Sequence, residues 1–193
     1  MSSLIKNILR KTYGAAREQL SESFQKKASL QVCSIIQNLD QYRYAKRIAL
    51  YSAQRGEVDL GALWKSAPLQ GKYCYFPVLT NNKHLAFLPA TPATPFKKNK
   101  YGILEPDVDP QLAIAAHELQ LIFVPLVVFD KRCNRIGMGS GYYDRSLASA
   151  PGTCLLGVAY EFQRHIWIPE QAWDVRLTAV ATEKTVYWRD ELQ

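Results

Sequence analysis

The sequence predicts an α/β protein: a three-layer α/β/α, Rossmann-like fold with a mainly parallel sheet, preceded by two N-terminal helices. Three observations predict this fold. Apolar residues recur at helical spacing over residues 4–39. Strand-like runs then alternate with helical segments, which is the pattern of a parallel sheet. Residues 121–129 form a continuous apolar run, as expected of a strand that is covered on both faces.

The N-terminal segment, residues 1–45, predicts two helices that pack on the α/β body. One apolar stripe runs from Leu4 to Leu20. Ser21 is the expected N-cap of a second helix that ends near Leu39. The inward-facing positions expected for this helix are Phe24, Ala28, Val32, Ile35, Ile36 and Leu39. Because the chain has 193 residues, we expect residues 1–193 to form one domain.

The α/β body supplies the remaining elements in order. Strands are expected at residues 47–52, 73–77, 84–88, 121–129, 154–159, 179–182 and 185–188. Helices are expected at residues 58–66 and 141–148. Residues 89–110 are rich in Pro, Thr, Lys and Asp, which predicts a long loop.

The net charge indicates an anionic partner. The chain carries a formal charge of +7, and its first 47 residues hold nine basic and three acidic groups. Such an excess is typical of proteins that bind nucleic acid, a membrane surface or phosphorylated small molecules. The local excess predicts a basic wall over a compact site for phosphates.

Several classes of protein are excluded by the composition. The longest apolar run has nine residues, whereas a membrane-spanning helix needs ~20. Lys6, Arg10 and Lys11 interrupt any signal peptide, although an amphipathic start without an acid before Glu18 leaves a mitochondrial presequence as an alternative. The four cysteines show no metal-site spacing. We expect a cytoplasmic protein with free thiols.

A glycine-rich loop is the most informative stretch. Residues 134–145 read NRIGMGSGYYDR and stand between a predicted strand and a predicted helix. Alternate glycines allow positive φ and let backbone N–H groups approach a phosphate, to which the helix start adds further donors. A nucleotide site is therefore expected at the carboxyl edge of the sheet. The spacing matches neither the P-loop nor the dinucleotide motif, so a tight turn that requires glycine is the alternative.

The residues around this loop resemble the signature of the 5-formyltetrahydrofolate cyclo-ligase family, also called methenyltetrahydrofolate synthetases. In that family a strand ending in Phe-Asp leads to an R-x-G-x-G-x-G-Y-Y-D motif. The matching residues are Phe129, Asp130, Arg135, Gly137, Gly139, Gly141, Tyr142, Tyr143 and Asp144. Further segments agree in order and spacing: the basic pair Lys6-x-x-x-Arg10, the acidic segment 56–59, the aromatic loop 101–106 and the strand motif 177–186. Ser140 stands where members often carry Gly or Lys, and Tyr101 where some carry Trp.

The resemblance implies an ATP-dependent ring closure. ATP phosphorylates the formyl oxygen of 5-formyltetrahydrofolate, because a formamide oxygen is a very poor leaving group. N10 then attacks the activated carbon, which gives 5,10-methenyltetrahydrofolate, ADP and phosphate. Positioning and electrostatics supply most of the catalysis in such a reaction.

The resemblance also implies which residues bind ATP and act in catalysis. The ATP-binding set is Lys6, Arg10, Tyr101, Arg135, Gly137, Met138, Gly139, Ser140, Gly141, Tyr142 and Arg145. The catalytic set is Arg135, Tyr143 and Asp144. Lys6 and Arg10 are one helical turn apart, and without the resemblance a solvated basic face is the simpler interpretation. For Arg135 the alternative is a charge on a surface loop, and for Arg145 it is an ion pair within the helix.

The folate and the metal have implied ligands too. Glu57 accepts hydrogen bonds from the amino-pyrimidine edge in this interpretation, and the alternative is a charge at a helix N-terminus. Tyr142 and Tyr143 bind the substrate, with one ring expected inward and Tyr143 expected on the folate. Asp144 is the expected Mg²⁺ ligand, and a cap or a pair with Arg145 is its alternative.

Two other functions remain open at this point. One is a basic RNA-binding protein that uses the N-terminal helices, although no nucleic-acid module is recognisable. The other is a different phosphate-ligand enzyme on a similar scaffold, such as a sugar-phosphate isomerase or a CoA-handling enzyme. The leading interpretation predicts ATP and 5-formyltetrahydrofolate, with or without a polyglutamate tail, as the small-molecule partners. A lysine loop (Lys97, Lys98, Lys100) is expected to steer ATP or this tail, and an exposed loop without such a role is the alternative. The leading interpretation also predicts no nucleic acid, no membrane, Mg²⁺ as cofactor, and a monomer or weak dimer.

Overall fold

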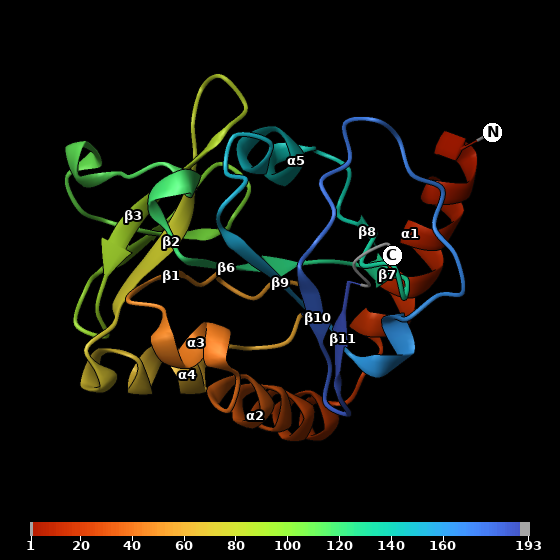
Figure 1. The fold of residues 1–193 in the computed structure, drawn as a ribbon, viewed down its shortest axis with the longest axis horizontal. Coiled ribbons are helices and arrows are strands. Elements are labelled where there is room, and N and C mark those ends of the chain that lie inside the picture. The colour runs from red at the N-terminus through yellow and green to blue at the C-terminus, as the bar shows by residue number, and fades with distance from the viewer. Residues whose placement is uncertain (1, 190–193) are drawn as a thin grey trace.

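A seven-stranded sheet forms the centre of the molecule, which we describe from a computed structural model over residues 2–189 (Figure 1). The strand order is β11-β10-β9-β6-β1-β2-β3. Its strands are β1 Arg47–Ala49, β2 Tyr73–Leu79, β3 Leu85–Ala90, β6 Leu121–Pro125, β9 Cys154–Val158, β10 Ala179–Ala181 and β11 Val186–Trp188. The five inner strands are parallel, and only the edge strands β3 and β11 pair antiparallel. The prediction of a mainly parallel sheet is confirmed.

Helices cover both faces of this sheet. The helices α2 (Glu22–Gln37), α3 (Asp40–Tyr44) and α4 (Gly61–Ser66) lie below it in Figure 1, and α5 (Tyr142–Leu147) lies above it. Alternate residues of β6 feed the two cores, because Phe123 packs with the α2 side and Ile122 with the α5 side. The α/β/α arrangement is therefore confirmed. Its second helical layer is thin, since α5 has six residues and is joined there by short 3-10 turns at Pro110–Leu112 and Ala116–Glu118.

The helix α2 begins where its capping residue predicts. The Oγ of Ser21 accepts a hydrogen bond from the Phe24 backbone N–H at 3.3 Å, which satisfies one of the free donors of the first turn. Ala28, Val32 and Ile36 are buried as expected. Phe24 is 39% exposed, so its expected inward position is wrong: it lies in the first turn of α2, where its ring contacts Tyr160 but remains open to solvent.

The helix α1 (Ser2–Glu18) lies apart from α2, at the right of Figure 1. It packs on a two-stranded ribbon formed by β7 (Val128–Phe129) and β8 (Arg135–Ile136). Leu9 is buried there against Val128 and Ile136. Both N-terminal helices exist as predicted, and α3 is an additional short helix.

Two predicted segments differ from the structure. The expected loop at residues 89–110 contains a hairpin of β4 (Phe96–Lys98) and β5 (Leu104–Pro106). The expected strand at residues 121–129 ends at Pro125, which has no N–H to donate to a ladder. The chain then leaves the sheet and continues as β7, which forms part of the surface on which α1 packs.

Burial explains the behaviour of two of the thiols. Cys33 and Cys74 are buried in the core on the α2 side. Desolvation there raises the pKa of each to about 11, which disfavours the reactive thiolate. Both therefore act as small apolar residues.

Among residues 2–189, no helix is long and apolar enough to cross a membrane.

Candidate active site

A cleft of about 1060 Å³ opens at the carboxyl ends of β1 and β6. It is bordered by α1, the glycine loop, the start of α5 and residues 171–175. The predicted site residues that line it are Lys6, Arg10, Glu57, Arg135, Gly137, Met138, Gly139, Ser140, Gly141, Tyr142, Tyr143, Asp144 and Arg145. The fold thus brings together residues from three distant parts of the chain, at the sheet edge where ligands bind in such folds.

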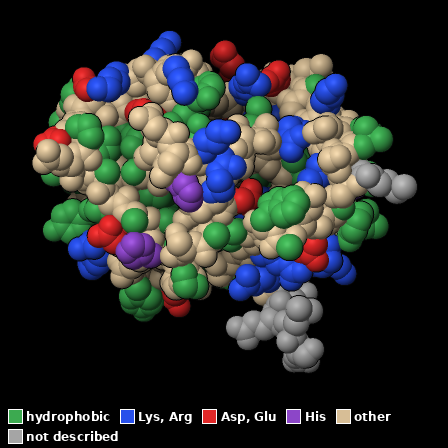
Figure 2. Space-filling view, turned by 90° about the horizontal axis from the view of Figure 1, so that it is seen from above, with side chains coloured by type: hydrophobic (Ala, Val, Ile, Leu, Met, Phe, Trp, Pro, Cys, Tyr) green, Lys and Arg blue, Asp and Glu red, His purple; other side chains and the backbone are tan. Residues whose placement is uncertain are grey.

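Two cations of α1 face this cleft. The Nζ of Lys6 pairs with Oδ2 of Asp174, and the Nε of Arg10 donates to the Gly137 carbonyl at 2.8 Å. The Lys6 side chain is only 12% exposed. A solvated basic face is therefore not what these two residues form. Figure 2, the view from the α5 side, shows further Lys and Arg side chains across this face with acidic ones between them.

The glycine loop needs glycine at two positions. Gly139 has φ +99° and Gly141 has φ +68°, in the left-handed region that side chains disfavour. A Cβ on Gly139 would also lie 3.4 Å from the guanidinium carbon of Arg10. The loop therefore takes a tight turn and at the same time brings its backbone close to a cation of α1.

Arg135 and Asp144 form an ion pair within the cleft. An Nη of Arg135 donates to Oδ1 of Asp144 at 2.7 Å, and its other Nη donates to the carbonyl of Val175. The backbone N–H of Val175 donates to the same Oδ1 at 3.2 Å. Arg135 is thus neither a surface charge nor free to turn, and Asp144 pairs with Arg135 instead of Arg145. Arg145 donates to the carbonyls of Ser140 and Lys83.

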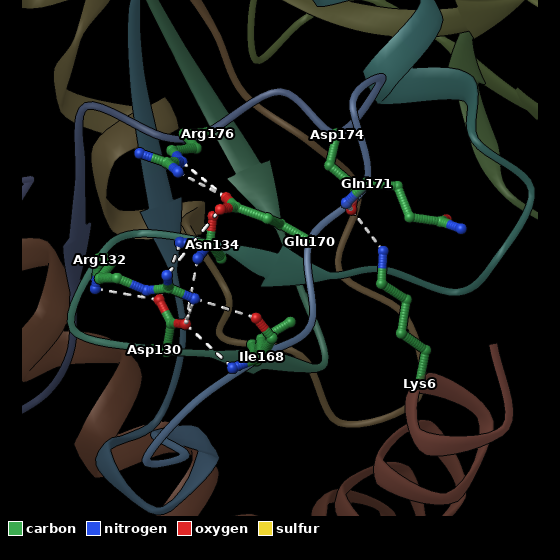
Figure 3. A network of polar contacts seen from close by, with 9 residues as sticks. All are labelled: Lys6, Asp130, Arg132, Asn134, Ile168, Glu170, Gln171, Asp174 and Arg176. Carbon is green, nitrogen blue, oxygen red and sulfur yellow. Dashed lines mark hydrogen bonds and ion pairs between the residues drawn. The ribbon is translucent and has the colours of Figure 1, made fainter. Parts of the chain in front are cut away.

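Asp130, the last residue of the Phe-Asp strand motif, is a buried structural anchor (Figure 3). Its carboxylate accepts backbone N–H groups of Asn134 and Ile168 at 3.1 and 3.0 Å. Arg132 continues this network by donating to the Ile168 carbonyl. These bonds tie the segment after Ile168 to the turn between β7 and β8, and that segment carries Asp174 into the cleft.

Residues 171–175 are the part of the site that sequence reasoning missed. Asp174 pairs with Lys6, its Oδ2 also accepts from the Gln171 N–H at 2.9 Å, and Val175 binds both partners of the central ion pair. The segment has no helix or strand of its own, so it shows no periodicity that could have marked it. Only Asp174, an acid among apolar neighbours, offered a signal.

Glu57 lines the cleft from the loop after β1. Its Oε2 accepts from the Gln54 N–H at 3.0 Å, and its Oε1 lies 3.5 Å from an Nη of Arg17. Burial raises the pKa of Glu57, and Arg17, the Gln54 N–H and Arg55 oppose that rise. The helix that was expected from residue 58 starts at Gly61, so Glu57 is not a helix N-terminal charge.

Tyr143 lines the cleft near both Glu57 and Arg135. Burial raises the pKa of its hydroxyl strongly, the nearby carboxylate of Glu57 raises it further, and Arg135 opposes this. The phenol is therefore neutral and can donate a hydrogen bond. Tyr142 also lines the cleft, and its hydroxyl is exposed whereas that of Tyr143 is buried, in line with the expected split of the two rings.

Tyr101 is the one predicted site residue outside the lining. It is 60% exposed at the tip of the β4–β5 hairpin, although its neighbours Asn99 and Ile103 do line the cleft. Desolvation and the neighbouring hydroxyl of Tyr101 raise the pKa of Tyr142, and Arg145 opposes this rise. The hairpin tip therefore flanks the mouth of the cleft.

Carboxylates in the described part of the chain do not gather into a cage. No group of three or more His, Cys, Asp or Glu side chains among residues 2–189 is arranged to hold a metal ion. Asp144 and Asp174 border the cleft from two segments. An ion held here would need ligands from a bound substrate as well.

Comparisons with known proteins agree on one family. The model of the 5-formyltetrahydrofolate cyclo-ligase family matches residues 3–183. The chain is 40% identical over 165 residues to the 5-formyltetrahydrofolate cyclo-ligase of Haemophilus influenzae, which covers 83% of this chain and 88% of that protein. It is 33% identical over 147 residues to the Escherichia coli K12 protein of the same name, with 74% and 81% covered.

Solved structures give the same result. The NMR structure of Aquifex aeolicus 5,10-methenyltetrahydrofolate synthetase superposes with a TM-score of 0.85 at 32% identity, covering 98% of this chain and 95% of the other. A 5,10-methenyltetrahydrofolate synthetase from Mycoplasma pneumoniae has a TM-score of 0.75 at 23% identity, over 92% and 98% of the two chains. This second likeness supports the fold.

Proposed function

The chain belongs to the 5-formyltetrahydrofolate cyclo-ligase family, and from that premise we propose how its cleft carries out the reaction. The enzyme converts 5-formyltetrahydrofolate to 5,10-methenyltetrahydrofolate with ATP as co-substrate, within one-carbon folate metabolism. The comparisons give no support to an RNA-binding protein or to another phosphate-ligand enzyme.

One observation carries the proposal: a single cleft is lined both by the cations of α1 beside the glycine loop and by the carboxylate of Glu57. Those cations are Lys6 and Arg10, and Arg135 and Tyr143 line the same cleft. We assign the part beside the α1 cations and the glycine loop, the phosphate end, to the phosphates of ATP. We assign Glu57 to the amino-pyrimidine of the folate.

The first chemical step forms a bond between the formyl oxygen and the γ-phosphorus. The nitrogen N5 pushes electrons onto the formyl oxygen, which attacks phosphorus, and the bond to ADP breaks. Negative charge moves to the oxygens of the transferring group and of ADP. Arg135, held rigidly by Asp144 and Val175, and the α1 cations neutralise that charge without having to reorganise.

The second step closes the ring. N10 attacks the carbon of the imidoyl phosphate, the bond from that carbon to the phosphate oxygen breaks, and the departing phosphate takes up the proton of N10. Glu57 fixes the pterin at one end while the neutral Tyr143 donates a hydrogen bond close to the reacting group. Tyr142 and Tyr101 lie where they can cover the adenine at the mouth of the cleft.

Mg²⁺ fits the carboxylates of this cleft. Mg²⁺ is usually held by one or two carboxylates together with substrate phosphates and waters, not by an all-protein cage. Asp144 supplies such an oxygen beside the phosphate end, and Asp174 supplies a second on the adjoining segment. The bound ion would add positive charge to the β- and γ-phosphates.

The rest of the proposal concerns the whole chain. Residues 1–193 act as one domain, with residues 1–45 as its helical part, and the protein is a cytoplasmic monomer or weak dimer. It needs no nucleic acid or membrane. A polyglutamate tail is attracted by Lys98 and Lys100 near the mouth, whereas Lys97 is paired with Asp107.

The experiment mixes the protein with 5-formyltetrahydrofolate, ATP and Mg²⁺ and follows the near-ultraviolet absorbance of the methenyl product. We expect product only with ATP, and its absence at micromolar enzyme would contradict the proposal.

Lys6→Ala should raise the KM for ATP about tenfold, because an ion pair with phosphate in a partly desolvated site is lost. Lys11→Ala removes the same charge from an exposed position of α1 and should leave the KM unchanged.

A further inference from the structure

Arg17 is a fully buried arginine that the mechanism above does not use. Its side chain is 2% exposed, and it does not belong to the residues that line the cleft in the described part of the chain. The Nε donates to the carbonyl of Arg55 at 3.0 Å, and an Nη donates to the carbonyl of Leu126 at 3.0 Å. The same Nη lies 3.5 Å from Oε1 of Glu57. A charge buried this deeply is costly unless it is paired and hydrogen-bonded, and these three oxygens supply the partners.

The position of Arg17 on α1 links it to the phosphate end. Arg10 is four and Arg17 eleven residues after Lys6, so the three side chains fall within about 40° of one another around the helix. Eleven residues rise about 16 Å along the axis. One face of α1 therefore presents two cations to the phosphate end of the cleft and a third to Glu57.

The loop that carries Glu57 is built around Arg17. Gly56 has φ +73°, and a Cβ there would lie 2.8 Å from the Arg17 carbonyl oxygen. The loop backbone thus closes directly onto the end of α1. The charged and titratable groups that face Glu57 are Arg17 from α1, Arg55 from its own loop, Tyr51 after β1 and Tyr143 from α5.

We propose that Arg17 is a positioning residue for the folate: its guanidinium keeps the Glu57 carboxylate ionised and aimed into the cleft. This inference rests on the proposed role of Glu57 as the partner of the amino-pyrimidine edge. Arg17 touches no substrate. Gln54 fixes one oxygen of Glu57 and Arg17 attracts the other, so the carboxylate keeps a fixed orientation.

The test compares Arg17→Gln with Arg17→Lys over a range of pH. Gln keeps a donor at the position of the arginine Nε, which binds the Arg55 carbonyl, but loses the charge, whereas Lys keeps the charge. Without the cation the pKa of Glu57 rises, so ionised Glu57 is lost at a higher pH. The acid limb of kcat/KM for the folate should move up by at least about one unit in Arg17→Gln. It should stay near the wild-type position in Arg17→Lys, and the KM for ATP should not change in either variant.

Lys11→Gln is the matched control, because it removes one charge from an exposed position of the same helix. Circular dichroism reports whether each variant is folded, and if Arg17→Gln fails to fold, Arg17→Lys still tests the inference. An unmoved acid limb in folded Arg17→Gln, or a limb moved equally in Arg17→Lys, would overturn it.

Glu57→Gln separates this inference from the proposed function. If the inference holds, Arg17→Gln produces no further rise in the folate KM when it is combined with Glu57→Gln. A full additional rise in the double variant overturns the inference alone. An unchanged folate KM in Glu57→Gln itself would remove the role of Glu57 and the inference with it, while ATP-dependent product formation would still support the enzyme activity.

Discussion

Arg135 and Asp144 show what one side-chain pair contributes to this site. The sequence places both in the motif, and a pair of Asp144 with its neighbour Arg145 was the alternative to its expected role as Mg²⁺ ligand. Consecutive residues on a helix do not face each other, and Arg135 reaches Asp144 from β8 instead. The bonds to Asp144 and to the Val175 carbonyl hold the Arg135 guanidinium in a fixed orientation before any substrate binds. Sequence reasoning therefore identified the residues but not which of them meet.

The residue-scale prediction concerns Asp144→Asn. Asparagine has nearly the same size and can still accept from the Val175 N–H, but it carries no charge for Mg²⁺ and pairs more weakly with Arg135. We expect kcat to fall on the order of a hundredfold and the Mg²⁺ concentration for half-maximal rate to rise. Steady-state rates in a Mg²⁺ titration measure both.

Asp107→Asn is the control for this change, because Asp107 forms an exposed pair with Lys97 outside the cleft lining. Its rates should equal those of the wild type. Thermal unfolding shows that both variants are folded at the assay temperature. Wild-type kcat and Mg²⁺ dependence in Asp144→Asn would mean that this carboxylate has neither role.

Elements were predicted well where the period of the sequence is clear. The periodic helices α1 and α2 and the parallel strands occur where the apolar pattern puts them. The β4–β5 hairpin was missed because its strands have three residues each and lie among prolines and lysines. The break after β6 was missed because an apolar run does not show that Pro125 ends the ladder and that the chain turns towards α1.

The glycine loop gives a prediction at the scale of an element. Gly139→Ala places a Cβ at φ +99°, which costs about 1–3 kcal/mol, and pushes against the guanidinium of Arg10. We expect the KM for ATP to rise about tenfold or more with a smaller effect on the KM for the folate. Gly152→Ala is the matched control, because a Cβ there meets no atom within 4 Å. Equal KM values for ATP in the two variants would exclude a phosphate-binding role for the loop.

At the scale of the whole molecule, the charge of +7 is less concentrated than the sequence suggested. Of the basic groups in residues 1–47, Lys6 and Arg10 line the cleft and Arg17 is buried beside Glu57. Others, such as Lys26 and Lys27, are exposed on α2. The expected basic wall is therefore a narrow strip on one face of α1.

The molecule as a whole also shows why the site could be predicted only in part. The motif residues could be read from the sequence, and the structure gathers Lys6, Glu57 and Asp144 into one cleft. The burial of Arg17 and the pairing of Lys6 with Asp174 depend on how distant segments pack, and no local pattern encodes them. Such tertiary contacts account for most of what sequence reasoning missed.

The central claim is that the cleft brings ATP and the folate together so that the formyl oxygen is phosphorylated and then expelled. A heavy-oxygen label in the formyl group of the substrate tests this directly. After a single turnover, mass spectrometry of the inorganic phosphate should find the label in phosphate, in one-to-one ratio with the methenyl product. Methenyl product accompanied by unlabelled phosphate, with the label released into water, would contradict this account.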